Sequence, residues 1–198
     1  MTNVIMLTGK AGCGKDTFYN IADNYIYDAT MGTVNVFNYA FADKIKESLY
    51  ALGWDGKKDD KGRRLLQHFG QTMREYDKDI WAKFAYKCIY DTEFSGVESV
   101  HIITDLRFPN EYTYVRDNLQ EDFPNSKLTV IKIVDRQSDL GANANDISEA
   151  GITEDILGKP FDYVLHNDGT LAEYKLQIKH VLEDLELLYD ENWCRAGK

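Results

Sequence analysis

The sequence has 198 residues with a formal net charge of −10, and 43% of the residues are hydrophobic and 28% charged. This length suits one α/β domain with a full hydrophobic core and is short for two, so residues 1–198 are predicted to form a single domain. The acidic balance argues against a polynucleotide partner, although a few basic side chains in a cleft can still bind a nucleotide. The longest apolar runs are strand-sized, which excludes a membrane-spanning helix.

The cysteines and the N-terminal residues indicate a cytoplasmic protein. Cys13, Cys88 and Cys194 stand singly, without the spacing of a disulfide framework or a zinc site. The first residues lack the basic and small-residue features of a secretory signal and lead directly into a glycine-rich loop. Reduced thiols in a cytoplasm are therefore expected.

The first part of the chain predicts alternating strands and helices. An apolar strand over residues 4–7 ends at the glycine-rich loop, and residues 15–25 follow with helical spacing. A second strand over residues 34–39 precedes a helix over residues 42–52 that stops at a glycine. The polar stretch 55–62, rich in glycine and lysine, is expected to be a surface loop.

The middle of the chain predicts a pair of helices followed by further strands. Helices over residues 63–76 and 79–90 are expected to pack together, because the first has a clear apolar face. A strand over residues 100–104, a helix over residues 109–119 that opens with proline, and a strand over residues 128–134 come next.

The last part of the chain predicts a lid and a closing helix. The polar segment 137–159 contains three glycines and no sustained periodicity, so it is expected to be irregular or partly helical and to act as a lid. A strand over residues 161–165 and a turn lead into a helix over residues 170–189, where Thr170 and Glu173 form a capping box. The alternation predicts an α/β fold with a parallel sheet of about five strands and helices on both faces.

The glycine-rich loop matches the Walker A spacing, with Lys15 directly after its last glycine. It lies between an apolar strand and an amphipathic helix, where backbone N–H groups can surround phosphates at a helix N-terminus. Lys15 would then reach the β- and γ-phosphates of ATP; the alternative is a glycine turn with a solvated lysine. The predicted ATP phosphate-binding residues are Gly9, Lys10, Ala11, Gly12, Cys13, Gly14, Lys15, Asp16 and Thr17.

Two carboxylates are candidate Mg²⁺ ligands. Asp16 stands where the usual motif has a Ser or Thr, and it can bind Mg²⁺ directly or through water, or act as an anion at the helix start. Asp105 follows the strand over residues 100–104, an arrangement that places an acid beside Mg²⁺ at the carboxyl edge of a parallel sheet. Both are predicted metal ligands, with ATP and Mg²⁺ as cofactors.

Two arginines are candidates for contact with the transferred phosphate. Arg107 and Glu111 are spaced i, i+4, which fits either a surface ion pair or a phosphate-binding arginine held by Glu111. Arg136 opens the polar segment, where a closing lid could bring it onto the transferred phosphate; the alternative is a solvated arginine.

The helix over residues 63–76 carries a candidate acceptor-binding face. Arg64, Gln67 and Gln71 share one side of it, and amides suit base edges while arginine suits phosphate. A merely solvated polar face is the alternative.

Aromatic side chains in the same region could stack on a base. Trp81, Phe41 and Tyr76 are the candidates. Aromatic residues in such helices also form hydrophobic core, so both interpretations stay open.

Taken together, the motifs resemble those of the deoxynucleoside monophosphate kinases of tailed phages, a P-loop family. The matching features are collinear and span nearly the whole chain. They are residues 14–17 (Gly-Lys-Asp-Thr), Phe41 with Ala42, Ile45 with Lys46, residues 63–67 with Gly70, Asp77 with Trp81 and Lys83, residues 104–107 with Glu111, Arg136, residues 148–151 and residues 167–171. Lys44 stands where the family tends to have Pro, and Asp146 where a His is common.

The resemblance implies a P-loop NTPase fold with an acceptor-binding helical region at about residues 40–95 and a lid at about residues 136–160. It implies transfer of the γ-phosphate of ATP to a deoxynucleoside monophosphate, a homodimer, and a place in the host cytoplasm. The implied catalytic residues are Lys15, Arg107, Arg136 and Asp105. The implied substrate-binding residues are Phe41, Lys46, Arg64, Gln67, Gln71, Trp81, Arg107 and Glu149, with Asn167, Asp168 and Gly169 as the loop on the adenine side.

Two other functions fit parts of the pattern. A P-loop kinase of another phosphorylated metabolite, such as phosphomevalonate, shares the Gly-Lys-Asp variant of the loop. The alternative from a different functional class is a nucleotide-binding switch that signals through a conformational change. The Asn-Lys-x-Asp element of guanine-specific switches is, however, missing from the sequence.

Overall fold

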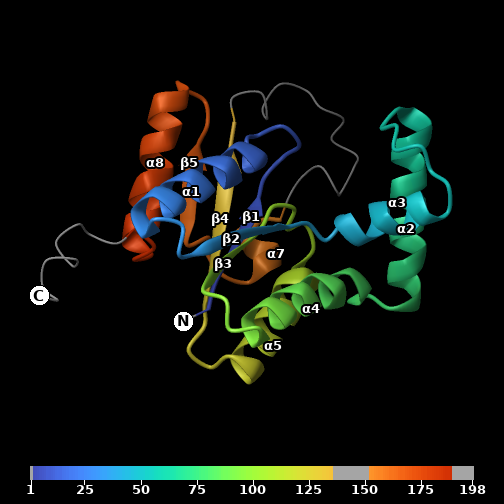
Figure 1. Cartoon of the computed structure of the whole chain (residues 1–198). Coiled ribbons are helices and arrows are strands. Elements are labelled where there is room, and N and C mark those ends of the chain that lie inside the picture. The colour runs from blue at the N-terminus through green and yellow to red at the C-terminus, as the bar shows by residue number, and fades with distance from the viewer. Residues whose placement is uncertain (1, 136–151, 189–198) are drawn as a thin grey trace, which may run out of the picture.

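A computed structural model describes residues 2–135 and 152–188 and shows an α/β fold built on a parallel sheet (Figure 1). The five strands lie in the order β2-β3-β1-β4-β5. Their bounds are β1 Asn3–Thr8, β2 Asn35–Tyr39, β3 Ser99–Ile103, β4 Lys127–Val134 and β5 Tyr163–His166. Because β1 is central, its carboxyl end is flanked by the ends of β3 and β4.

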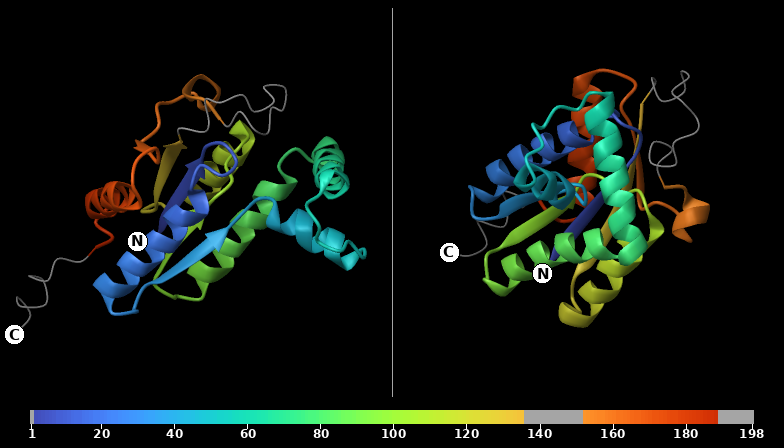
Figure 2. Two further views of the ribbon diagram at one scale, coloured as in Figure 1. Left: turned by 90° about the horizontal axis from the view of Figure 1, so that it is seen from above. Right: turned by 90° about the vertical axis from the view of Figure 1, so that its right-hand side faces the viewer.

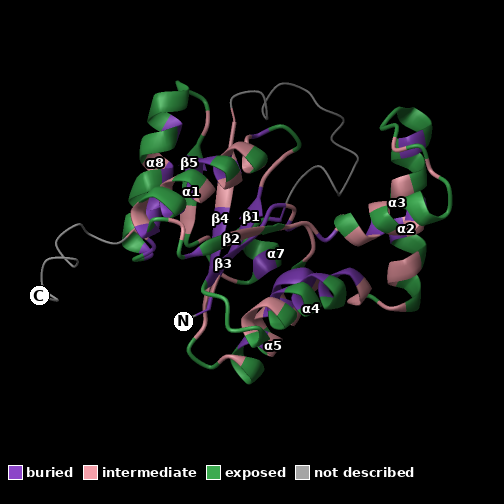
Figure 3. Cartoon of the chain, viewed as in Figure 1, coloured by how far each residue is buried: buried purple, intermediate pink, exposed green. Residues whose placement is uncertain are grey.

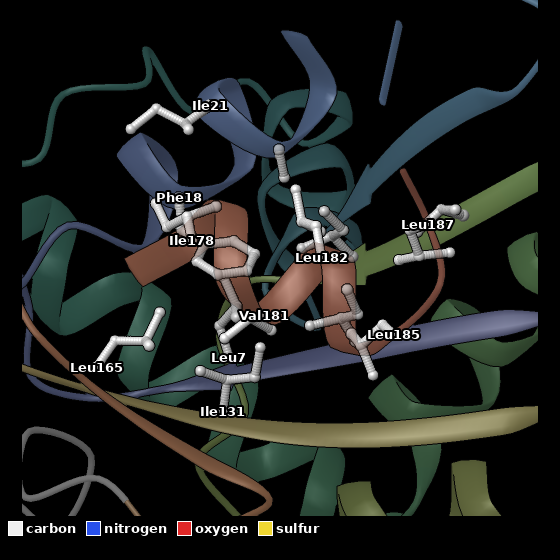
Figure 4. Packing of buried hydrophobic residues seen from close by; sticks show 14 of the residues in the cluster. Leu7, Phe18, Ile21, Ile131, Leu165, Ile178, Val181, Leu182, Leu185 and Leu187 are labelled. Carbon is white, nitrogen blue, oxygen red and sulfur yellow. The ribbon is translucent and has the colours of Figure 1, made fainter. Parts of the chain in front are cut away.

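Two helices, α1 (Lys15–Thr30) and α8 (Leu171–Asp184), cover one face of the sheet. Leu7, Ile131 and Leu165 point from the strands toward α8, where they meet apolar side chains of both helices (Figure 4). Successive strand residues point to opposite faces, so the alternate residues of β1 belong to the core on the other side of the sheet.

The other face is covered by α4 (Ile80–Phe94) and α5 (Pro109–Asp122), with the short helix α7 (Glu154–Leu157) against α5. Helices α2 (Asp43–Ala51) and α3 (Asp60–Tyr76) extend beyond α4 to one side of the sheet (Figure 1, Figure 2). This side extension corresponds to the region predicted to bind the acceptor.

The predicted fold class is confirmed, and the element bounds differ in explicable ways. Helix α3 begins three residues earlier than predicted, because Asp59 Oδ1 accepts a hydrogen bond from Gly62 N and caps the helix. Strand β5 begins two residues later, since the side chain of Asp162 accepts a hydrogen bond from Val130 N and the chain bends at residue 162. Helix α8 ends earlier, where Glu186 adopts a φ of 60° and the chain turns back.

The predicted lid lies mostly outside the described residues, which resume at Ile152. That residue is 1% exposed, and its backbone N–H donates to Thr8 Oγ1 at the end of β1. Within residues 2–135 and 152–188, no helix combines the length and apolar character that crossing a membrane requires.

Candidate active site

The glycine-rich loop follows β1 and ends at the first turn of α1, so its N–H groups lie at the positive end of a 16-residue helix. Gly9 and Gly14 have φ angles of 143° and 103°, which L side chains rarely adopt. A Cβ on Gly9 would lie 2.4 Å from Ile133 O, and one on Gly14 would lie 2.4 Å from Asn167 Nδ2. Gly9 and Gly14 are therefore required both by backbone conformation and by close packing.

Lys15 lies over the loop that it follows. Its Nζ donates to Gly9 O and to Lys10 O, each at 2.8 Å, and lies 3.5 Å from Cys13 Sγ. Cys13 is 2% exposed, and burial raises the pKa of its thiol, so it acts as a small neutral residue inside the loop. The ammonium group of Lys15 therefore lies against the carbonyl oxygens of the loop, and its contact with phosphate remains a prediction.

The turn after β5 supports the loop from the other side. Asn167 Nδ2 donates to Cys13 O at 3.0 Å, and the buried Tyr174 of α8 donates through its hydroxyl to Gly14 O at 3.1 Å. Asp168 and Gly169, the other predicted adenine-side residues, are exposed beside this contact. Their nucleotide contact remains a prediction.

The connection after β3, here the β3–α5 loop (residues 104–108), carries Asp105 and Arg107. Asp105 accepts hydrogen bonds from Phe41 N at 2.7 Å and Ala42 N at 3.0 Å, which ties the loop to the start of α2. Leu106 N donates to the backbone oxygen of Leu7 in β1 at 3.1 Å. Burial raises the pKa of Asp105. The β3–α5 loop therefore lies directly beside the strand that leads into the glycine-rich loop.

The two predicted metal ligands suit Mg²⁺ only as part of a ligand set. Asp16 is exposed in the first turn of α1, and Asp105 lies partly buried at the end of β3. In the described part of the chain no group of three or more His, Cys, Asp or Glu side chains is arranged to hold a metal ion. Mg²⁺ commonly binds through one or two carboxylates together with substrate phosphates and water. Asp16 can act in this way at the start of α1, whereas both oxygens of Asp105 already accept backbone N–H groups, and the roles of both residues as metal ligands remain predictions.

The side chain of Glu111 holds the β3–α5 loop by accepting hydrogen bonds from the backbone of the loop. It is 2% exposed, and its Oε2 accepts hydrogen bonds from Arg107 N at 2.9 Å and Phe108 N at 3.0 Å. Its Oε1 forms an ion pair with Arg74 Nη2 of α3 at 3.7 Å. Burial and the nearby Asp105 raise the pKa of Glu111 to about 8.

Arg74 was missed in the sequence, although a signal was present. It continues the spacing of Arg64, Gln67 and Gln71 by one more helical step, and these three residues are exposed. Figure 3 shows exposed residues at several places along α3. The predicted acceptor-binding face therefore ends at a partly buried arginine that reaches the β3–α5 loop.

Two predicted substrate contacts are core residues. Phe41 and Trp81 are 2% and 3% exposed in the core cluster around α2 and α4, and Trp81 Nε1 donates to Gly70 O at 3.1 Å. Their burial fits the core alternative, and we leave them out of the candidate site. Lys46 pairs with Asp43 Oδ1 at 2.7 Å on the partly exposed start of α2.

Arg136 and Glu149, the predicted lid residues, lie outside the described residues. Their roles stay predictions.

No protein-family model and no curated protein matches the sequence. Solved structures do match. The thymidylate kinase of Ehrlichia chaffeensis has a TM-score of 0.52 at 13% identity, covering 93% of this chain and 98% of that one. The APS kinase of Mycobacterium tuberculosis in complex with AMPPNP and APS has a TM-score of 0.51 at 13% identity, with the same coverage. A tunicamycin resistance protein of Deinococcus radiodurans has a TM-score of 0.51 at 11% identity, covering 93% and 96% of the two chains. The chain therefore has the fold of the P-loop kinases.

Proposed function

We propose that the protein is an ATP-dependent kinase that transfers the γ-phosphate of ATP to a deoxynucleoside monophosphate and releases the diphosphate. The observation that carries this proposal is the juxtaposition at the end of β1. The phosphate-binding loop with Lys15 leaves this strand, and the loop with Asp105 and Arg107 is hydrogen-bonded to it. Similarity in fold to a thymidylate kinase and to an APS kinase bound to AMPPNP and APS supports phosphoryl transfer to a nucleotide.

The proposed chemistry needs positioning and charge neutralisation and no catalytic base. The phosphate of a nucleoside monophosphate is already largely ionised near neutral pH and is itself the nucleophile. The loop amides and Lys15 bind the polyphosphate, while Arg107 and Arg136 neutralise charge on the transferred group. Asp16 and Asp105 would hold Mg²⁺, which supplies further neutralisation of phosphate charge.

The exposed face of α3 is the proposed acceptor-binding surface. Arg64 can pair with the acceptor phosphate, and the amides of Gln67 and Gln71 suit the hydrogen-bonding edge of a base. This face lies in the side extension formed by α2 and α3, at the end of the sheet where the β3–α5 loop is tied to α2.

A coupled assay of ATP consumption tests the proposal across the deoxy- and ribonucleoside monophosphates, with phosphomevalonate as a further acceptor. We expect ATP consumption to rise sharply with at least one deoxynucleoside monophosphate. The Lys15→Met protein, purified in parallel, measures any contaminating host kinase. Consumption that no monophosphate stimulates would contradict the proposal and favour a nucleotide-binding switch, and stimulation by phosphomevalonate alone would reassign the acceptor.

A further inference from the structure

Helix α3 is anchored to the rest of the molecule near its middle. Gly70 is buried there, and a Cβ at this position would lie 3.0 Å from Ile45 Cδ1 of α2. The carbonyl of Gly70 accepts the hydrogen bond from Trp81 of α4. These contacts fix the point at which α3 crosses α2 and α4. Because they lie near the middle of the helix, the direction of the helix axis depends on further contacts at its ends.

The C-terminal turn of α3 is anchored by Arg74. Its guanidinium Cζ lies 4.3 Å from the ring centroid of Phe108, and Nη2 lies 3.7 Å from Glu111 Oε1 at the start of α5. The side chains of Arg74 and Glu111 are 21% and 3% exposed. Removing one partner of a pair this well buried lowers the stability of the protein, because the other charge is then buried without compensation.

Glu111 connects this anchor to the site. One carboxylate oxygen faces Arg74, and the other accepts the backbone N–H groups of Arg107 and Phe108. The same carboxylate therefore joins the acceptor-binding helix to the backbone that carries Arg107. A shift of the last turn of α3 would be transmitted to that backbone through a single side chain.

We propose that Arg74 and Glu111 form a latch, meaning this ion pair with its backbone hydrogen bonds, which sets the position of α3 and its bound acceptor relative to Arg107. Neither residue is assigned a contact with substrate; both are positioning residues. The inference rests on the proposed function for its kinetic consequence, while its structural consequence can be measured in the unliganded protein.

Kinetics separate a positioning role from a merely stabilising one. In Arg74→Met and Glu111→Gln we expect the KM for the acceptor to rise and kcat to fall, together about tenfold in kcat/KM, while the KM for ATP changes less than twofold. The double variant should be no worse than the worse single variant, because both changes break the same connection. Arg74→Lys, which keeps the charge and loses the planar contact with Phe108, should show a smaller rise in acceptor KM. Burial and the nearby Asp105 raise the pKa of Glu111 to about 8, so the ion pair is complete only above that pH, and the kinetic comparisons are therefore made at pH 9.

Arg116 offers a matched control. It also has a carboxylate partner and an aromatic ring, with Nη2 2.6 Å from Asp117 Oδ1 and Cζ 5.4 Å from the ring centroid of Tyr112, but its side chain is 40% exposed on α5. Arg116→Met should leave both KM values and kcat unchanged, because exposed pairs contribute little. A loss of acceptor affinity in this control equal to that in Arg74→Met would overturn the latch.

Amide hydrogen exchange tests the latch without any assumption about the reaction. The backbone amides of Arg107 and Phe108 should exchange about tenfold faster in Glu111→Gln and Arg74→Met than in the wild-type protein, with the strand amides of β1 unchanged. Unchanged exchange with an unchanged acceptor KM overturns the latch even if the wild type phosphorylates deoxynucleoside monophosphates. A wild type that phosphorylates none contradicts the proposed function, and the exchange result then decides the latch alone.

Discussion

Replacing Lys15 by methionine should nearly abolish phosphoryl transfer and leave the fold intact. In the structure the ammonium group makes two hydrogen bonds of 2.8 Å, to Gly9 O and Lys10 O. Bonds of this charged type contribute roughly 1.5–3 kcal/mol when buried. Lys15 is partly exposed and water can replace these bonds, so we expect a stability loss of about 1 kcal/mol. For a chain of this size that shifts the melting temperature by about 2–4 °C.

The effect on catalysis should be much larger, because the lysine contributes most where phosphate charge develops. Loss of one preorganised donor at such a site costs about 3–4 kcal/mol of transition-state stabilisation. Since 1.36 kcal/mol corresponds to a tenfold change in rate, kcat should fall by about 10²–10³. The coupled assay at saturating ATP and acceptor measures kcat, and thermal melting measures stability.

Lys179→Met is the matched control for this substitution. Lys179 lies on the exposed side of α8, 3.6 Å from Glu183, and is far less enclosed than Lys15. Its replacement should change neither kcat nor the melting temperature appreciably. A Lys15→Met protein with kcat within about threefold of wild type would refute the role of the loop in phosphate binding. A fall in melting temperature beyond about 10 °C would show that the lysine is mainly structural.

Three further substitutions test other parts of the structure. Gly14→Ala should weaken ATP binding more than tenfold in a direct titration. The φ of 103° alone costs an L residue about 1–2 kcal/mol, and the added methyl group would collide with the side chain of Asn167 in the turn after β5. Trp81→Phe should cost about 0.5–1.5 kcal/mol in urea unfolding, through loss of the bond to Gly70 O, and should change the acceptor KM less than threefold; a tenfold rise would restore Trp81 to the substrate site. His101, whose Nε2 lies 2.7 Å from Glu93 Oε1, has its pKa lowered by burial, so the unfolded chain binds its proton more readily. The contribution of His101 to stability should therefore be lost as pH falls below about 6.5, so between pH 7.5 and 5 the wild type should lose free energy of unfolding relative to His101→Gln; a difference between the two proteins that stays constant with pH would refute this role.

The order of strands and helices could be predicted from the sequence because its signals are local. Glycine spacing, the apolar run of β1 and the capping box at Thr170 each depend on neighbouring residues, and the structure has these elements. The start of β5 was wrong because a distant contact decided it, since Asp162 binds the backbone of β4; the start of α3 was wrong because of a local cap, the side chain of Asp59, that the apolar pattern does not include.

The site was harder to predict, because periodicity does not tell a core aromatic from a stacking surface. Phe41 and Trp81 have the spacing of either, and only the packing of α2 and α4 buries them. The spacing along α3 could have placed Arg74 on the same face as Arg64, but its pairing with Glu111 of another helix could not be read from the sequence. Glu111 itself was expected to act on Arg107, and its hydrogen bond to the backbone of that residue could not be read from an i, i+4 spacing.

The support of the phosphate-binding loop by Asn167 and Tyr174 has a consequence for biosynthesis. Their partners, Cys13 and Gly14, lie 154 and 160 positions earlier in the chain. Contacts that span so much sequence form late in folding, since the whole intervening segment must close first. If the loop binds ATP as proposed, a nascent chain should acquire full affinity for it only after α8 has emerged from the ribosome and docked beside α1, so that translation itself delays nucleotide capture until the sheet is complete.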